Sequence, residues 1–290
     1  MRLHLSLFTV SVLTALLAGG SSAIATKTAR PATQPRPSSS TVKPPAHKLI
    51  WADNFNGPAG APPNPAKWQP VAWPGGTGDG ELEYYTTRPS NVSLDGSGHL
   101  VITARRETYT GDGTTRSYTS GRIQTSGLFQ TTYGELEARI KWPAGQGLWP
   151  AFWSLGYDYD RVGWPNSGEI DVMETLGNNP FTAYGTIHGP SADSPKGYGM
   201  TTYTRSRVLL TAGFHVYGVI WSPSKIVFTL DGMPYAARSR ASLGRGDRWA
   251  FNKPFYLILD LAVGGVWPGS PDASTRFPAR MLVDWVRVYS

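Results

Sequence analysis

The amino-acid sequence predicts an all-β domain, built as a sandwich or jelly roll of antiparallel strands. Three observations support this prediction. Apolar and polar residues alternate along several segments, as they do in strands that bury one face. The chain contains 33 glycines and 24 prolines, which supply the many turns that short strands need. No long stretch combines a helical period with helix caps.

The expected strands are spread over the second and last thirds of the chain. Alternation or an apolar run marks five segments, which are 99–107, 121–130, 134–142, 255–265 and 281–290. A sixth segment, 217–232, is predicted to form a hairpin that turns at Ser222-Pro223-Ser224. In the segment 134–142 the apolar residues occupy even positions and the charged residues odd positions, so we expect one buried and one solvated face.

The first 48 residues differ in composition from the rest. Arg2 and His4 precede an apolar run, and Ala23-Ile24-Ala25 follows it as a small-x-small cleavage site, so residues 1–25 are predicted to be a secretory signal peptide. An uncleaved membrane anchor is the alternative. Residues 26–48 are rich in Pro, Ser and Thr and are predicted to be a disordered linker. Residues 49–290 are then the folded domain of a secreted, extracellular protein with no membrane segment after cleavage.

The net charge of +7 comes mainly from the N-terminal segment. Six of the 27 Lys and Arg residues and none of the 20 acidic residues lie in residues 1–48, which leaves the folded domain close to neutral. A nucleic-acid partner requires a basic face on the domain itself and is therefore not expected. The chain has no cysteine, so an exported domain must be held together by its core alone. We expect a monomer.

Three carboxylates, Glu169, Asp171 and Glu174, lie within six residues of the stretch GEIDVMET. In a helix Glu169 and Glu174 would point about 140° apart, and in a regular strand Glu174 would fall on the opposite face from the other two. One extra residue, a β-bulge near Val172–Met173, would bring all three to one face. The two glutamates would then be able to approach to about 5–5.5 Å, the carboxyl separation of a retaining glycosidase.

Such a row of acids suits three functions. In catalysis, the two glutamates would do the chemistry and Asp171 would orient and tune one of them. A calcium or other metal site, completed by His188, is the second interpretation. A solvated strand face is the third, although like charges on one face repel one another. The spacing alone leaves all three interpretations open.

The stretch SGEIDVMETLG resembles the catalytic motif of glycoside hydrolase family 16, in its Glu-x-Asp-x-x-Glu form. Other stretches resemble bacterial laminarinases, the endo-1,3-β-glucanases of this family. They are YTSGRIQTSGLF, YGELEARIKWPAGQGLWPAFWSLG, GTIHGP, FHVYGVIWSPSKIVFTLDG, PFYLILDLAVGGVWPG and VDWVRVYS. The resemblance runs from about Leu49 to the C-terminus and so covers the whole expected domain.

The resemblance implies a jelly roll of two antiparallel sheets with a concave substrate cleft. It implies an endo-acting enzyme that cleaves internal β-1,3-glucosidic bonds of β-glucans such as laminarin, with retention at the anomeric carbon. Glu169 matches the nucleophile, Asp171 the assisting acid and Glu174 the general acid/base. Other family activities stay open, namely mixed-linkage glucan, galactan or agar hydrolysis and transglycosylation, as does a non-catalytic β-glucan-binding protein.

The resemblance also implies which residues contact the polysaccharide. Trp149, Trp153 and Trp267 match aromatic residues of the cleft, where sugar rings stack on indole rings. Core packing is the alternative for each tryptophan. His188 matches a polar residue of the cleft, with a structural hydrogen-bond role as the alternative. Arg122 is expected to reach a sugar hydroxyl.

One stretch departs from the laminarinase pattern. Laminarinases often read Gly-Asn-Asn-Glu-Leu-Gln-Tyr-Tyr in the N-terminal part of the cleft, whereas this chain reads GDGELEYY at 78–85. Glu81 is kept as an expected substrate contact, but Asp79-Gly80 replace the Asn pair and Glu83 replaces Gln. The departure leaves the exact glucan open.

The resemblance implies no cofactor for catalysis, but it does imply a structural metal. Family members commonly bind Ca²⁺, and Asp284 of VDWVRVYS resembles the carboxylate ligand. Backbone carbonyls near Gly98 are expected to complete the site, because hard cations take oxygen ligands. The ion would stabilise the fold without taking part in the chemistry.

Overall fold

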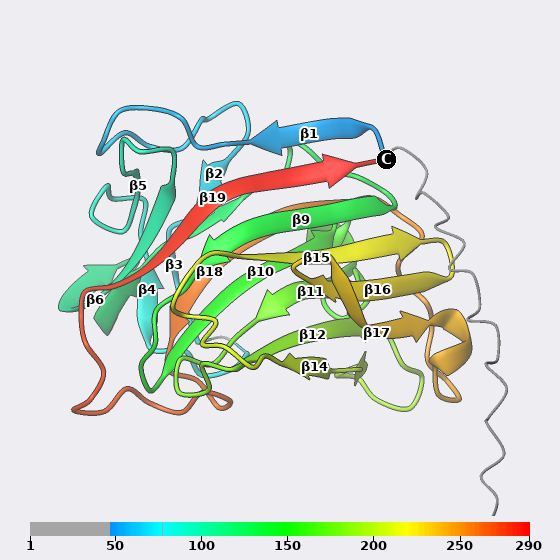
Figure 1. Ribbon diagram of the computed structural model, residues 1–290. Helices are drawn as coiled ribbons and strands as arrows, with labels where there is room; N and C mark the ends of the chain where they lie inside the picture. The colour runs from blue at the N-terminus through cyan, green and yellow to red at the C-terminus, as the bar shows by residue number, and fades with distance from the viewer. Residues whose placement is uncertain (1–46, 77) are drawn as a thin grey trace, which may run out of the picture. The chain divides into compact units, whose positions relative to one another are not determined.

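The computed structural model describes residues 47–76 and 78–290. The expected signal peptide (1–25) and all but the last two residues of the expected linker (26–48) lie outside this part of the chain. In the described residues, 19 strands form two sheets, and helical structure is limited to α1 (Tyr159–Val162) and the 3-10 helix η1 (Arg240–Ser242). Neither helix in these residues has the length and hydrophobicity of a membrane span. The predicted all-β class is confirmed, and Figure 1 shows the strands as two curved layers.

The first sheet has eleven strands. Their order is β17, β16, β15, β9, β19, β6, β7, β4 and β3, with β1 paired to β19 and β5 to β6. The bounds are β1 Leu49–Asp53, β3 Trp73–Pro74, β4 Glu83–Tyr85, β5 Val92–Leu94, β6 Leu100–Gly111, β7 Thr114–Ser120, β9 Gly134–Lys141, β15 His215–Ser222, β16 Lys225–Leu230, β17 Met233–Ser239 and β19 Ala279–Tyr289. The pair β4–β7 is parallel, which departs from the expectation of purely antiparallel sheets.

The second sheet has eight strands and contains the acidic stretch in β11. Their order is β13, β12, β11, β10, β18, β8 and β2, with β14 paired to β12. The bounds are β2 Gln69–Pro70, β8 Arg122–Gln124, β10 Leu148–Gly156, β11 Glu169–Glu174, β12 Thr182–Gly189, β13 Tyr198–Gly199, β14 Thr202–Arg205 and β18 Phe255–Val263. The acidic strand thus lies inside the sheet, between β10 and β12, and not at an edge.

The two sheets bury their facing sides in one hydrophobic core. Alternate residues of β18, from Phe255 to Val263, belong to this core, so the residues between them lie on the opposite face. In β9, Leu136, Ala138 and Ile140 are fully buried while the charged residues between them stay partly exposed. The alternation predicted for this segment is confirmed. Burial of apolar area, at roughly 25 cal/mol per Å², is the main stabilising contribution available to a chain without disulfides.

Most of the expected strands are found, with shifted ends. The segment 217–232 forms the hairpin β15–β16, and its turn at Pro223-Ser224 lies where the sequence predicts it. The strand expected over 121–130 is shorter, because a turn follows directly after β8, in which the Leu128 N–H donates to the Thr125 carbonyl at 3.0 Å. Gly127 supplies the positive φ of 72° in this turn.

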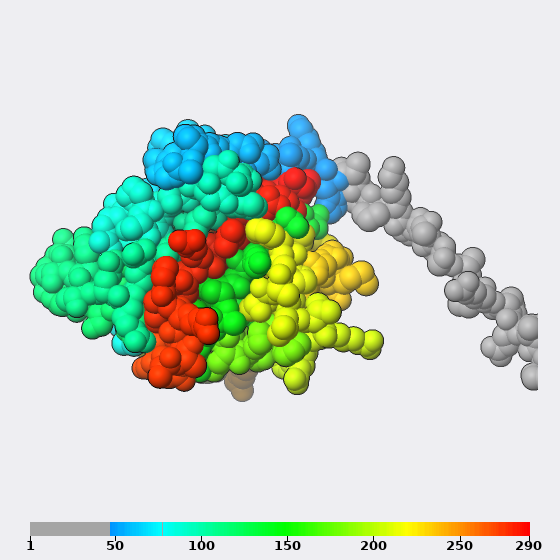
Figure 2. All heavy atoms as spheres, turned by 60° about the vertical axis from the view of Figure 1, so that its left-hand side comes forward, coloured from blue at the N-terminus to red at the C-terminus, as the bar shows by residue number. Residues whose placement is uncertain are grey.

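The first described residues lie against the last ones. The Ser290 N–H donates to the Lys48 carbonyl at 2.9 Å, and His47 Nδ1 lies 2.8 Å from Glu135 Oε2. The C-terminal strand β19 occupies the middle of its sheet, between β9 and β6. The space-filling view accordingly shows the last residues (red) between the early strands (cyan to green) and the yellow segment that contains β15 and β16 (Figure 2).

Candidate active site

The acidic stretch contains the β-bulge that its spacing predicts. Asp171 and Met173 pair with adjacent residues of β10, so Val172 has no partner of its own. The register against β12 also shifts between Asp171 and Glu174. Val172 and Met173 are both buried in the core between the sheets. The side chains of Glu169, Asp171 and Glu174 therefore point from the same, outward face of the sheet.

Neighbouring strands add further side chains to this outward face. Core residues alternate along β10, β12 and β18, which places the residues between them on the side away from the other sheet. We call this surface the carboxylate face. Its residues are Trp149, Trp153, Glu169, Asp171, Glu174, Tyr184, Thr186, His188, Tyr256 and Asp260.

Glu174 is held by two donors, one from the strand on each side. Trp149 Nε1 in β10 donates to Oε1 at 3.1 Å, and the Thr186 hydroxyl in β12 donates to Oε2 at 3.2 Å. Burial raises the pKa of Glu174 to about 7, although both hydrogen bonds and His188 favour the charged form and lower it. Glu174 is therefore suited to carry a proton near neutral pH and to give it to a leaving group.

Glu169 and Asp171 form a carboxyl pair beside His188. His188 Nε2 lies 3.3 Å from Asp171 Oδ2 and 3.8 Å from Glu169 Oε1. Burial, and then a neighbouring acid, raises the pKa of each carboxyl well above its ordinary value. The interaction between the two carboxyl groups raises the pKa of Glu169 and opposes the rise in the pKa of Asp171. A proton shared between the two carboxyl groups would leave the pair with one negative charge.

These distances bear on the three interpretations of the acidic stretch. Asp171 keeps only 3 % of its surface exposed, so a solvated strand face does not describe it. One ligand atom from each of Glu169, Asp171 and His188 lies within 4.8 Å of the others, and His and carboxylate groups are ligands of divalent metals. The geometry thus accommodates both the catalytic and the metal-binding interpretation.

Trp149, Trp267 and Tyr184 form an aromatic group next to Glu174. Trp267 lies in the loop after β18, and its ring centroid is 5.6 Å from that of Trp149 and 4.8 Å from that of Tyr184, in edge-to-face contacts. Trp267 keeps 37 % of its surface exposed, so it is not a core residue. Partly exposed rings beside a proton donor offer a surface on which a sugar ring is able to stack.

Arg122 and Trp153 form a second group on the same face. The Arg122 guanidinium carbon lies 4.7 Å from the ring centroid of Trp153 and 5.7 Å from that of Trp73, a cation–π arrangement. Trp153 Nε1 donates to Asp260 Oδ2 at 3.0 Å. Burial raises the pKa of Asp260 to about 7, with Arg122 acting in the opposite direction. The expected contacts Arg122 and Trp153 are thus brought together, with Asp260 beside them.

Glu81 lies in the segment that precedes β4 and runs past the end of β18. It forms an isolated β-bridge with Gly264. Two residues on, the Val266 N–H donates to the Asp79 carbonyl at 2.7 Å. The stretch 78–85, which differs from the laminarinase pattern, is therefore attached to the loop that carries Trp267, at one side of the carboxylate face.

Four residues of the carboxylate face were not predicted from the sequence, namely Thr186, Tyr184, Tyr256 and Asp260. Thr186 precedes His188 by two positions in GTIHG and so shares its strand face, which is a usable signal once the strand is assigned. Asp260 is the single acid in the apolar run FYLILDLAV, and a lone charge in a buried strand requires a polar environment. Tyr184 carries no comparable signal, because its position depends on contact with the distant loop of Trp267.

The two residues expected to bind calcium lie at one end of the β6–β19 pair. Asp284 follows Val283, whose partner in β6 is Leu100, and Gly98 precedes Leu100 by two residues. A Cβ atom built on Gly98 would lie 3.6 Å from Asn56 Oδ1 and 3.9 Å from the Asn54 carbonyl oxygen, so oxygen atoms gather at this position. Asp284 is also ion-paired with Arg139 through Oδ2. The oxygen donors fit a hard cation, and Arg139 competes with it for one oxygen of Asp284.

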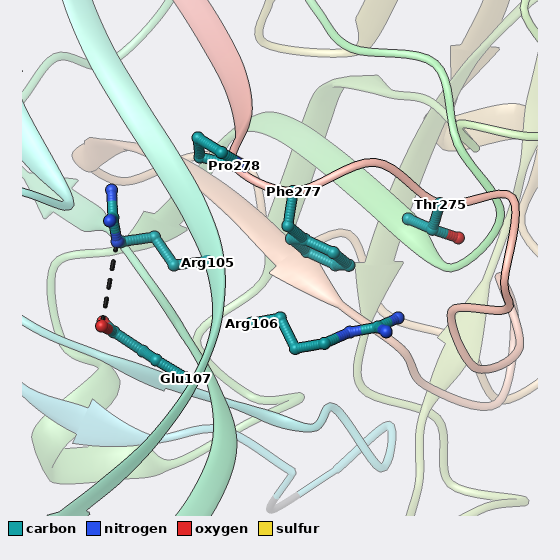
Figure 3. A pocket seen from close by; sticks show the side chains of 6 residues that line it. All are labelled: Arg105, Arg106, Glu107, Thr275, Phe277 and Pro278. Atoms are coloured by element: carbon teal, nitrogen blue, oxygen red, sulfur yellow. Dashed lines mark ion pairs between the residues drawn. The ribbon is translucent and has the colours of Figure 1, made fainter.

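A pocket of about 300 Å³ lies between β6 and the segment that leads into β19 (Figure 3). Its lining residues are Arg105, Arg106, Glu107, Thr275, Phe277 and Pro278. Figure 3 shows the Arg106 side chain beside Phe277, with the guanidinium carbon 5.3 Å from the ring centroid. None of the lining residues belongs to the carboxylate face, so this pocket is separate from the candidate active site.

Comparisons with known proteins agree with the geometry. The profile of "Glycosyl hydrolases family 16" matches residues 81–287. The β-glucanase of Rhodothermus marinus is 38% identical over 254 residues, which cover 85% of this chain and 86% of the relative. Keratan-sulfate endo-1,4-beta-galactosidase of Sphingobacterium multivorum is 36% identical over 255 residues, which cover 86% of this chain but 56% of the relative.

Solved structures show the same architecture. The X-ray structure of endo-β-1,3-glucanase from Pyrococcus furiosus superposes with a TM-score of 0.77 at 46% sequence identity, covering 84% of this chain and 94% of that one. The matched residues include the bulged strand β11 with its three outward carboxylates. This chain belongs to family 16 of the glycosyl hydrolases.

Proposed function

We propose that the protein is a secreted, endo-acting retaining hydrolase of internal β-1,3-glucosidic bonds in β-glucans such as laminarin. The observation that carries the proposal is the bulge in β11, which sets Glu169, Asp171 and Glu174 on one face with Trp149 and Thr186 holding the last of them. The names of two relatives, a β-glucanase and an endo-β-1,3-glucanase, support a β-glucan as the substrate.

In the first step Glu169 attacks the anomeric carbon. A bond forms between its carboxylate oxygen and that carbon, while the bond from the carbon to the glycosidic oxygen breaks. Glu174 donates its proton to the departing oxygen, so the leaving sugar departs as a neutral alcohol. A pKa of about 7 keeps a proton available on Glu174 in neutral and mildly acidic solution.

In the second step water replaces the enzyme on the anomeric carbon. Glu174, now a carboxylate, takes a proton from the water as the oxygen attacks. The ester bond to Glu169 breaks, which regenerates its carboxylate. Two inversions give net retention, so the new reducing end has the β configuration.

Asp171 and His188 prepare Glu169 for this chemistry. Attack requires Glu169 to be ionised, so in the reactive arrangement the proton shared by the carboxyl pair lies on Asp171, which donates it in a hydrogen bond to Glu169. His188 Nε2, 3.3 Å from Asp171 Oδ2, orients the pair from the neighbouring strand β12. Asp171 is in this account a positioning acid, and not a nucleophile.

The aromatic residues of the carboxylate face bind the sugar rings. Trp149, Trp267 and Trp153 are partly exposed, so each offers indole surface for contact with the C–H faces of glucose units. Arg122 and Glu81 supply polar contacts at the β8 and β18 side of the face. We further take residues 1–25 as the export signal, the mature protein as an extracellular monomer, and Ca²⁺ at Asp284 and Gly98 as structural.

The direct test is a reducing-sugar assay on laminarin, with and without chelator, beside lichenan, agar and keratan sulfate. Keratan sulfate is included because one relative is named for its cleavage. We expect release of mixed oligosaccharides from laminarin and equal rates with and without chelator. Binding of laminarin without release of reducing ends would support a binding protein instead. Activity lost in chelator and restored by metal would favour the metal-dependent interpretation of the acidic stretch.

A further inference from the structure

Glu83 is a buried acid that the proposed chemistry does not use. It begins β4, and its residue has 0 % exposed surface. Its Oε2 accepts a hydrogen bond from the Val263 N–H at 2.7 Å, while the Leu82 N–H donates to the Val263 carbonyl, also at 2.7 Å. The side chain and the preceding amide thus bind both backbone polar groups of Val263, the last residue of β18.

The opposite oxygen of Glu83 is enclosed. Oε1 is buried and has no hydrogen-bond partner among the described residues. A Cβ atom on Gly75 would lie only 2.4 Å from Oε1, so the chain passes against this oxygen at a place where only glycine fits. The Gly75 N–H in turn donates to the Glu83 carbonyl at 3.0 Å. No ion pair reaches Glu83 in residues 47–76 and 78–290.

The segments joined by Glu83 form one side of the carboxylate face. From Val263 the chain continues into the loop that carries Trp267, and Trp267 packs against Trp149, the donor to Glu174. On the other segment, Glu81 pairs with Gly264. The hydrogen bond from the Val263 N–H to Glu83 holds the end of β18 in place, and the loop that carries Trp267 begins at this end.

The charges around Glu83 disfavour its ionised form. Glu81 in the same segment and Asp260 in β18 are acidic, and Tyr85 in β4 is a neutral phenol nearby. Two arginines lie in the region, and neither is ion-paired with Glu83: Arg116 of β7 donates to the Gly75 carbonyl, and Arg122 of β8 lies over Trp153. Burial first, and then these acids, raise the pKa of Glu83 to about 8, although its bond from Val263 opposes the shift.

We propose that Glu83 is a positioning residue that works as a neutral carboxylic acid, fastening the segment 79–83 to the loop of Trp267. Its carbonyl oxygen then accepts from the Val263 N–H, as the amide oxygen of a glutamine would. Unlike Gln, the acid ionises as the pH rises. A carboxylate at this site would be desolvated, unpaired and beside two other acids, so the attachment weakens and the carboxylate face changes shape. This proposal rests on the proposed function for its activity readout only.

The sign of the effect follows from the raised pKa. In the unfolded chain Glu83 titrates near its ordinary value of 4.5, and in the folded protein near 8. Its contribution to stability is fully present below the unfolded value and is lost as the pH rises through the folded one. A replacement of Glu83 that cannot ionise should therefore stabilise the folded protein at alkaline pH.

The test compares wild type with Glu83→Gln, Glu83→Met and the control Glu137→Gln. Glu137 is a half-buried glutamate of β9, four strands away from β4 in the same sheet, whose pKa burial also raises. Melting temperature is measured from pH 5 to pH 9, and kcat/KM on laminarin over the same range. We expect Glu83→Gln to melt close to wild type at pH 5 and about 10 °C above it at pH 8 to 9. We expect its kcat/KM, relative to wild type, to rise about tenfold between pH 7 and pH 9.

The other variants separate this role from general packing. Glu83→Met fills the space without an acceptor for the Val263 N–H, so it should be less stable and less active than Glu83→Gln at every pH. For Glu137→Gln, the kcat/KM relative to wild type should change by no more than about twofold over this pH range, and the difference in melting temperature should stay nearly constant. The proposal would be overturned if the difference in melting temperature between Glu83→Gln and wild type, and the ratio of their kcat/KM values, both stayed constant with pH. It would also be overturned if the Gln and Met variants had the same melting temperature and kcat/KM. If wild type does not cleave laminarin, the proposed function fails, while the melting curves still decide the role of Glu83.

Discussion

Trp149 Nε1 donates a hydrogen bond to Glu174 Oε1 at 3.1 Å, and the same indole ring meets the ring of Trp267 edge to face. One side chain thus touches both the candidate proton donor and the candidate sugar platform. The hydrogen bond favours the carboxylate form of Glu174 and so lowers its pKa against the larger effect of burial. In the proposed mechanism, Trp149 therefore couples substrate binding to proton transfer.

Trp149→Phe should move the alkaline limb of the pH–rate profile to higher pH. Phe keeps an aromatic ring but removes the donor, so the pKa of Glu174 rises further above its ordinary value, and the residue keeps its proton to a higher pH. A hydrogen bond to a charged group contributes about 1.5–3 kcal/mol, so we expect a shift of roughly one to two pH units together with a lower kcat. The profile of kcat/KM measures it. Trp153→Phe is the control, because its indole donates to Asp260 and not to Glu174.

Trp267→Ala should reduce turnover far more than stability. The residue is 37 % exposed, so its removal leaves no closed cavity, and we expect a small change in melting temperature with at least a tenfold loss of kcat/KM. Trp142, which is 1 % exposed, provides the contrast, since Trp142→Ala should cost about 3–5 kcal/mol of unfolding free energy. If Trp267→Ala loses stability in proportion to its activity, the core interpretation is correct for this residue as well.

Calcium should raise the melting temperature without changing kcat. The gathering of oxygen atoms at Gly98 and the carboxylate of Asp284 motivate this expectation. A bound ion stabilises the folded state by mass action, by about 2.7 kcal/mol at a hundredfold excess over Kd. Thermal unfolding in chelator and in millimolar Ca²⁺ tests it, with Asp284→Asn expected to lose the difference. Identical melting in both solutions would show that Arg139 is the sole partner of Asp284.

Export should trim the chain near Ala25. The apolar run and the Ala-x-Ala site motivate this prediction, and both fall outside the described residues. N-terminal sequencing of protein collected from the medium should begin near Ile24 or Thr26. A mature protein that retains Met1, or that stays with the membrane fraction, would support the uncleaved anchor.

The arrangement of β11 was predictable because it depends on local spacing. Residues 169, 171 and 174 fit one strand face only if a bulge intervenes, and the chain provides two apolar residues, Val172 and Met173, for the core side. The alternation in β9 was predictable for the same reason. A strand over 121–130 was wrong in length, because the turn at Thr125 depends on a hydrogen bond that alternation does not reveal.

The protonation states of the buried acids were harder to predict from the sequence. Glu169 matches the nucleophile, which has to be charged to attack, but burial raises its pKa, and the neighbouring Asp171 raises it further. Asp260 and Glu83 were missed as buried acids for a related reason. Each is buried beside a hydrogen-bond donor more than a hundred positions away, Trp153 and Val263 respectively, and no short pattern contains both partners.

The central claim is the division of labour between the two glutamates. Glu174→Ala keeps the nucleophile, so it should still form the glycosyl-enzyme from a β-1,3-glucan oligosaccharide with an activated leaving group. Added azide then enters from the face that water would use and restores turnover. Glu169→Ala has no nucleophile, so azide would attack from the vacated face in a single displacement.

NMR of the azide products is the measurement that tests this division most directly. The account predicts a β-glycosyl azide from Glu174→Ala and an α-glycosyl azide from Glu169→Ala. The opposite pairing of variant and anomer would exchange the two roles, and an α-configured first product from the wild type would contradict the retaining mechanism itself.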